Sequence, residues 1–327
     1  MTAQPPTPSA RDLQFTQKKK AREVKERFIE FVLFLAAFSC VATTVAIMYI
    51  LISESVLFFQ QVSLVEFLTS KDWSPLFDPP GYGVLPLISG TLTTTAVALS
   101  VALPMGLISA IYLSEFAPAN VREVVKPILE LLAGIPTVVY GYFALLTVIP
   151  ILQWLYLPIG SFLFNVFPGI FPAELAGFNM LGAGLVMGLM ITPLISSISE
   201  DAMRSVPINL KEGSYATGAT RLQTALKVVL PAAASGVIAA FILGVSRAVG
   251  ETMIVAIAAG LQPTFTFNPL ESAATITAYI VQVSLGDLPH GTLEYQTIFA
   301  AGLVLVLVTL VFNVIGYFLT KRFRETY

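Results

Sequence analysis

Six predominantly apolar stretches limit how this 327-residue chain can fold, because each is about as long as a bilayer is thick. A helix needs about 20 such residues to cross the hydrocarbon layer. We therefore expect an all-α, polytopic membrane protein with six transmembrane helices. The expected spans are residues 28–53, 85–114, 128–153, 178–199, 225–250 and 296–320.

Composition excludes several other classes of protein. Hydrophobic residues make up 56% of the chain and charged residues only 12%, too few to cover the surface of a soluble domain of this length. The single cysteine, Cys40, and the single histidine, His290, leave no candidate disulfide or metal cluster. A glycine-rich phosphate loop ending in Lys-Ser/Thr is also missing, so we expect no cofactor on this chain and ATP hydrolysis only on another.

Lysine and arginine predict the orientation of the spans. All but two of the 18 basic residues lie in the N-terminal tail, the loops after the second and fourth spans, or the C-terminal tail. The exceptions are Lys71 and Arg247. By the positive-inside rule, both termini are expected in the cytoplasm of a cell whose inner membrane the chain crosses. Residues 1–27 are then a basic cytoplasmic tail rather than a cleaved signal, and 321–327 a second tail.

Two further apolar stretches make the number of spans uncertain. Residues 156–172 are interrupted by Pro158, Gly160, Pro168, Gly169 and Pro172, which favours an interfacial or re-entrant piece at the outer face. If this stretch crossed the membrane, every later basic residue would change sides. Residues 252–261 are too short to span alone and are interpreted as a continuation of the fifth span or a re-entry beside it.

A loop after the fourth span carries a spaced motif. Glu212-Gly213-Ser214 is followed by Gly218, and Leu230-Pro231 closes the pattern 12 residues further on. It resembles the Glu-Ala-Ala…Gly…Leu-Pro motif of ABC importer permeases, with Gly213 and Ser214 replacing the two alanines. The resemblance implies a short helix that docks on a separate ATPase, for which an acidic residue early in the helix and a terminal glycine are suited. An ordinary amphipathic connector is the alternative.

The fifth span contains a pair of opposite charges. Arg247 and Glu251 are four residues apart and share one face if the helix continues through Gly250. An arginine inside a span costs about 2.5–3.5 kcal/mol on insertion scales, which favours a position facing protein or a cavity. A guanidinium can bind two oxygens of an oxyanion. The alternatives are a structural salt bridge or a pair at the outer interface.

The segment 246–253, Ser-Arg-Ala-Val-Gly-Glu-Thr-Met, resembles the phosphate permeases of the ABC importer family. Residues 90–95, 111–115 and 134–141 resemble the same family. The resemblance implies a type I importer permease core over residues 85–320, with 28–84 as an added first helix and outer segment. It also links Arg247 and Glu251 to phosphate passage. Thr91 and Thr94 are candidate hydroxyls of that path, or they bond back to their own helix.

The function that this resemblance implies is ATP-driven phosphate import by alternating access. The expected partners are a second permease, two ATP-binding subunits that hold ATP and Mg²⁺, and an outer phosphate-binding protein. Two other functions remain open: a permease for sulfate or molybdate, and an ion-coupled secondary transporter. The secondary transporter would have internal inverted repeats, which are not evident in this sequence.

Overall fold

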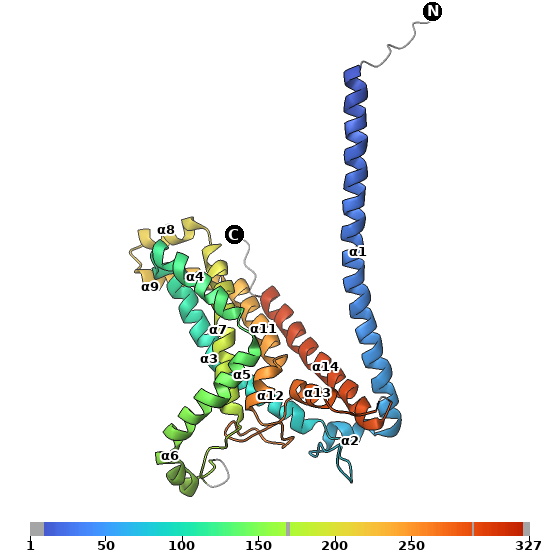
Figure 1. The fold of residues 1–327 in the computed structure, drawn as a ribbon. Coiled ribbons are helices and arrows are strands. Elements are labelled where there is room, and N and C mark those ends of the chain that lie inside the picture. Colours follow the sequence, from blue (N-terminus) through green and yellow to red (C-terminus); the bar gives the residue numbers. More distant parts are fainter. Residues whose placement is uncertain (1–9, 168–170, 290, 323–327) are drawn as a thin grey trace, which may run out of the picture. The chain divides into compact units, whose positions relative to one another are not determined.

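The computed structural model describes residues 10–167, 171–289 and 291–322, so His290 and Arg324 lie outside the described residues (Figure 1). The regular elements in these ranges are helices, three of them π-helical turns labelled η. In chain order they are α1 Ala10–Gln61, α2 Leu64–Thr69, α3 Leu85–Ile111, η1 Tyr112–Phe116, α4 Ala119–Ala133, α5 Thr137–Phe143, η2 Ala144–Val148, α6 Ile149–Val166, α7 Met180–Arg204, α8 Ile208–Ala216, α9 Arg221–Thr224, η3 Ala225–Val229, α10 Leu230–Ala232, α11 Ala234–Val249, α12 Met253–Ala258, α13 Ile276–Ser284 and α14 Leu293–Arg322.

Five stretches are long and apolar enough to cross a membrane, and they confirm the all-α, polytopic fold class. A sixth span results if Arg221–Ala232 and Ala234–Val249, which meet at 74°, form one broken crossing. The five stretches are Lys25–Gln61, Leu85–Phe116, Thr137–Val166, Met180–Arg204 and Leu293–Arg322.

The chain divides into two compact units, Met1–Ser53 and Glu54–Tyr327. Within the first, α1 begins at Ala10, so the basic tail is helical before the expected start of the span. The second unit begins at Glu54 and includes the outer segment together with residues 85–320. The reason is that buried aromatic side chains of the outer segment, including Phe67 and Trp73, pack in one cluster with Leu87 and Tyr279.

The third span differs from its prediction. We expected residues 128–153, but Gly134 and Pro136 end α4 and start a separate helix at Thr137. Because Pro136 cannot continue the helical hydrogen bonding of α4, the chain breaks there. The span then runs to Val166 and includes most of the stretch that we had interpreted as interfacial or re-entrant. Residues 156–166 are helical throughout, with Pro158 and Gly160 accommodated inside α6, and their interfacial or re-entrant placement stays a prediction.

Two π-helical turns precede prolines inside spans. The turn η2 ends at Val148, two residues before Pro150, and η3 ends at Val229, two residues before Pro231. A proline lacks an N–H and its ring crowds the carbonyl four residues earlier, and a wider turn relieves both. The fifth span bends by 74° at Ala233, directly after Pro231 and the short helix α10.

The second unit is built around α3 and α7, which pack closely along their lengths. Small residues permit this approach: a Cβ on Gly188 would lie 2.6 Å from the Ala98 carbonyl oxygen, and one on Gly184 would lie 2.7 Å from Val97. Helix α11 packs on α7 by the same means, since a Cβ on Gly244 would meet Ile195 at 2.8 Å. These contacts fix the position of α11, which carries Arg247.

Helices α8 and α9 lie at one end of the second unit, together with the C-terminal end of α14 (Figure 1). Towards the other end lie α2, α12 and α13. Between the expected fifth and sixth spans lies a further helix of the core, because α13 packs against α14 and α3 and buries Ile276 and Tyr279. Within residues 252–261, Met253–Ala258 form the separate short helix α12, which packs against α5 and α7.

Candidate functional site

Arg247 lines an open cavity of about 490 Å³ in the second unit. It lies in the last turn of α11, and its side chain is exposed to the cavity. The cavity is bounded by residues of α7, α11 and the segment that follows α11: Leu194, Leu243, Ser246, Arg247, Gly250 and Glu251. The role of Arg247 as a substrate contact stays a prediction.

Arg247 and Glu251 share the cavity but form no ion pair in the described part of the chain. Helix α11 ends at Val249, with Gly250 as its C-cap, so the condition for a shared helical face is not met. The polar contact that remains to the guanidinium is the Met190 sulfur, 4.0 Å from Nη2. A thioether is a weak acceptor, so the guanidinium keeps most of its hydrogen-bonding capacity for a ligand.

The Glu251 carboxylate is engaged in the backbone instead. Its Oε1 accepts hydrogen bonds from the N–H groups of Met253 at 3.2 Å and Ile254 at 3.5 Å. These are unpaired donors at the start of α12, where a negative charge also suits the helix dipole. The Thr277 hydroxyl donates to the Glu251 carbonyl oxygen at 2.6 Å. Glu251 therefore fixes the break between α11 and α12, and only 7% of it is exposed.

Thr91 and Thr94 do not line the Arg247 cavity. Both are buried in α3, and their hydroxyls donate to carbonyl oxygens of the preceding turn, Leu87 and Gly90, each at 2.7 Å. The Thr91 hydroxyl also accepts from the N–H of Ile276 at the start of α13. Their assignment to a phosphate path stays a prediction, while the observed bonds match the alternative of back-bonding to the helix.

The motif loop forms helix α8, which buries none of its residues. Glu212, Gly213 and Ser214 lie in its middle and second half, because the helix begins at Ile208, after Pro207. The expectation that Glu212 stands early in the helix is therefore wrong. Gly218 follows the helix with φ of +85°, and its N–H donates to the Tyr215 carbonyl at 2.9 Å. Glycine adopts this left-handed conformation without strain, which explains the motif glycine.

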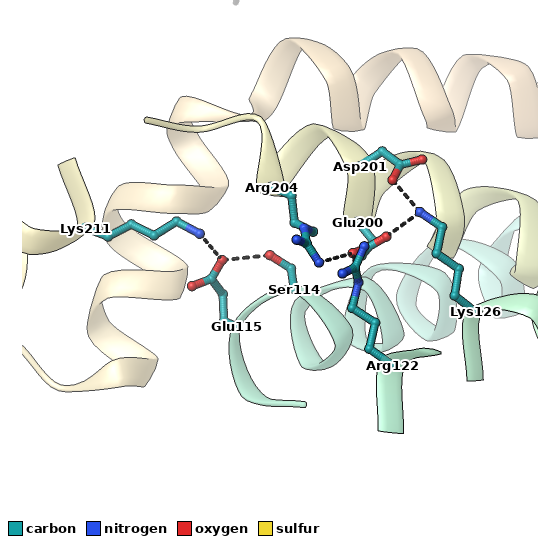
Figure 2. A network of polar contacts seen from close by, with 8 residues as sticks. All are labelled: Ser114, Glu115, Arg122, Lys126, Glu200, Asp201, Arg204 and Lys211. Carbon is teal, nitrogen blue, oxygen red and sulfur yellow. Dashed lines mark hydrogen bonds and ion pairs between the residues drawn. The ribbon is translucent and has the colours of Figure 1, made fainter. Parts of the chain in front are cut away.

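Charged residues at the α8 end form a network that sequence analysis did not find (Figure 2). Glu200 of α7 has a side chain that is 1% exposed and binds Arg122 of α4 at 2.7 Å and Lys126 at 2.8 Å. Lys126 also pairs with Asp201, and Arg204 lies 3.7 Å from Glu200. We had treated the basic residues only as markers of orientation. The signal available in the sequence was the pair of acidic residues at the end of an apolar span.

A second part of the network reaches α8. Lys211 Nζ lies 2.6 Å from Glu115 Oε1, and the Ser114 hydroxyl donates to the same oxygen at 2.7 Å (Figure 2). The two charged side chains are 13% and 7% exposed. Glu115 belongs to η1, which continues α3, so the ion pair joins the motif helix to one of the two central spans.

The chain combines a broken candidate membrane span, an arginine on an open cavity and an exposed helix in the loop before that span, an arrangement suited to a membrane permease. Residues 102–325 match the family of binding-protein-dependent transport system inner membrane components. Among solved structures, a bacterial ABC transporter involved in the import of the acidic polysaccharide alginate superposes with a TM-score of 0.60 at 17% identity, over 94% of this chain and 100% of that one. This likeness shows the fold.

Curated relatives narrow the class. The chain is 36% identical to the probable ABC transporter permease protein YqgH of Bacillus subtilis over 96% of both chains. It is 33% identical to the phosphate transport system permease protein PstC of Mesorhizobium japonicum over 78% of each, and 34% identical to PstC 1 of Mycobacterium tuberculosis over 80% of this chain and 83% of that one. The chain belongs to the binding-protein-dependent transport inner membrane component family and, within it, to the PstC-type permeases.

Proposed function

We propose that this chain is a transmembrane permease subunit of an ATP-driven importer that moves inorganic phosphate into the cytoplasm by alternating access. The observation that carries the proposal is the guanidinium of Arg247, which faces an open cavity and forms no ion pair among the described residues. The names of the PstC relatives supply the substrate, since those proteins are phosphate permeases.

The chemistry of the cavity suits a transient oxyanion contact. Arg247 can donate two parallel hydrogen bonds to phosphate oxygens, and Ser246 lies beside it on the cavity wall. Glu251, on the same wall, brings a negative charge. This charge opposes tight anion binding, because a like charge nearby raises the free energy of the bound phosphate. A path that must release its substrate needs this balance between capture and escape.

Helix α8 is the proposed contact for the ATPase. It buries no residue in this chain, and a pocket of about 350 Å³ lies beside it, formed by Ser214, Thr217, Gly218, Ala219, Gln223, Lys227 and Val228. The proposed partners are two PstB-like subunits that bind ATP and Mg²⁺, a second permease of the PstA type and an outer PstS-like phosphate-binding protein. The lysine and arginine asymmetry favours both termini and α8 on the cytoplasmic side.

Transport by vesicles tests the proposal. Proteoliposomes with this chain and its partner subunits should accumulate radiolabelled phosphate only with ATP and the loaded binding protein. Arg247→Gln should abolish uptake while the complex still assembles, because glutamine has neither the charge nor the fork of donors. The matched control is Arg204→Gln, since Arg204 is exposed and 3.7 Å from its partner. Normal uptake by the Arg247→Gln complex would refute the anion contact.

The same vesicles distinguish the alternative functions. Uptake of sulfate or molybdate in place of phosphate would assign another oxyanion to the cavity. Uptake driven by a proton or sodium gradient without ATP would assign a secondary transporter.

A further inference from the structure

Helix α8 is attached to the rest of the described chain by two polar contacts that lead to different spans. The first is the Lys211–Glu115 ion pair at 2.6 Å, which reaches η1 at the end of α3 (Figure 2). The second joins the hydroxyls of Ser214 and Thr224 at 2.9 Å and reaches α9. Helix α8 buries none of its own residues, and its apolar contact is the partly buried Leu210 against the cluster that includes Ala110 and Met203, so the polar contacts add to a small apolar one.

The two attachments lead towards the two helices that line the Arg247 cavity. Helix α9 continues through η3 and α10 into α11, which carries Arg247. Helix α3 packs along α7, which supplies Leu194 to the cavity lining and is joined to α8 by residues 205–207. Close glycine contacts between α3 and α7 make these two helices a rigid pair, since neither backbone can slide without a clash.

The Lys211–Glu115 ion pair is well placed to transmit a displacement from one helix to the other. Both side chains are largely excluded from solvent, and Glu115 Oε1 is also held by the Ser114 hydroxyl. An ion pair in this setting has a fixed geometry and weak screening by salt, unlike the exposed Arg22–Glu26 pair of α1, whose side chains are 80% and 53% exposed. At the same end of the unit, Glu200 ties α4 to α7, so a displacement of α3 reaches three helices.

We propose that Lys211 and Glu115 are positioning residues that hold α8 against the end of α3, so that a displacement of α8 reaches the α3–α7 pair as well as α11. Without the pair, the short connection at residues 205–207 between α7 and α8 takes up part of the displacement, and the cavity opens incompletely at each ATP cycle. The inference rests on the proposed function, because it needs an ATPase that displaces α8.

The test uses the whole reconstituted complex and measures phosphate imported per ATP hydrolysed. The variants are Lys211→Met, Glu115→Gln and the exchanged pair Lys211→Glu with Glu115→Lys. The control is Arg22→Met, which removes the exposed ion pair. Assembly is measured by co-purification of all subunits, and ATP hydrolysis is normalised to assembled complex.

Each single variant should keep ATP hydrolysis but lower the phosphate-to-ATP ratio by about tenfold, a coupling loss in the usual allosteric range. The exchanged pair should restore most of the ratio, and Arg22→Met should leave it unchanged. An unchanged ratio in the single variants would overturn the inference, as would a loss of uptake that only follows a loss of assembled complex. A failure of the exchanged pair to restore the ratio would also overturn it, because the loss would then not arise from this contact.

The wild-type complex separates this inference from the proposed function. If wild-type vesicles import no phosphate with ATP, the proposed function fails. If they import phosphate and the single variants do so with the same ratio, only the role of the pair fails.

Discussion

The backbone N–H of Ile276 donates a 3.0 Å hydrogen bond to the Thr91 hydroxyl, which joins the start of α13 to α3 across 185 residues of sequence. Thr94, one helical turn further along α3, donates only to carbonyl oxygens of its own helix. Two neighbouring threonines of one apolar span therefore differ in what they hold together.

Thr91→Val should destabilise the folded permease, since valine keeps the shape and leaves the buried N–H of Ile276 without an acceptor. The expected cost is about 1–3 kcal/mol, the penalty for an unsatisfied buried donor. Thr94→Val should cost less, because no other element loses a partner. Thermal unfolding of the purified protein in detergent measures the difference. If both variants keep stability and Thr91→Val alone lowers uptake per complex, Thr91 belongs to the phosphate path instead.

Gly218→Ala and Gly213→Ala should change stability in opposite directions. Alanine at Gly218 must adopt φ of +85°, which costs about 1–2 kcal/mol, although its Cβ would meet no atom within 4 Å. Gly213 lies inside α8 with open space around it, so alanine there should favour the helix by up to about 1 kcal/mol. Thermal unfolding of the isolated permease tests both signs. Equal effects would show that the end of α8 does not need a left-handed residue.

Glu251→Gln should keep the junction of α11 and α12, because the glutamine oxygen can still accept from the N–H of Met253. Glu251→Ala removes that acceptor and should cost about 1 kcal/mol, as for the loss of a helix cap. The neutral glutamine should also tighten phosphate binding in the cavity, since a repelling charge is gone. Equilibrium binding of labelled phosphate to the permease in nanodiscs measures this. Weaker binding in Glu251→Gln would contradict the proposed balance of charges.

Glu200→Gln should destabilise the permease by about 3 kcal/mol, the low end of the range for a broken buried ion pair, because Arg122 and Lys126 lose their shared partner. The low end applies because those side chains are 27% and 21% exposed. Arg204→Gln should change stability by less than about 0.5 kcal/mol, because the Arg204–Glu200 contact is 3.7 Å long and the arginine side chain is 45% exposed. Denaturant or thermal unfolding checks the ranking, and a larger effect at Arg204 would reverse it.

Alkaline pH should weaken the same cluster. Burial lowers the pKa of Lys126, but its hydrogen bonds to Asp201 and Glu200 outweigh this and raise the pKa above the ordinary value of 10.5. A raised lysine pKa contributes stability that is fully present below the unfolded value and is lost as pH rises through the folded value. The contribution of Lys126 to the unfolding temperature should therefore stay constant below about pH 10.5 and decline as the pH rises further, through the raised folded pKa. Lys126→Met should remove this pH-dependent part of the unfolding temperature. A dependence that persists in the variant would exclude Lys126 as its source.

The pattern of apolar residues predicted the fold class and most of the spans, because a bilayer imposes one length on every crossing helix. It placed the second, fourth and sixth spans within a few residues of α3, α7 and α14. It failed for the third span, where hydropathy does not distinguish an apolar face of α4 from a crossing helix. The Gly134–Pro136 break was visible in the sequence, but its effect depends on whether neighbouring helices accommodate the turn.

For the site, the sequence by itself determined which groups could meet an oxyanion or an ATPase, since residue chemistry and motif spacing are local properties. Arg247 and the helix around Glu212 were found in this way. Only the tertiary structure decided how charges are paired, because pairing depends on where each helix ends and which helix lies beside it. Helix α11 stops at Val249, so Glu251 caps α12 and Arg247 has no ion pair among the described residues, while Lys211 meets Glu115 from 96 residues away.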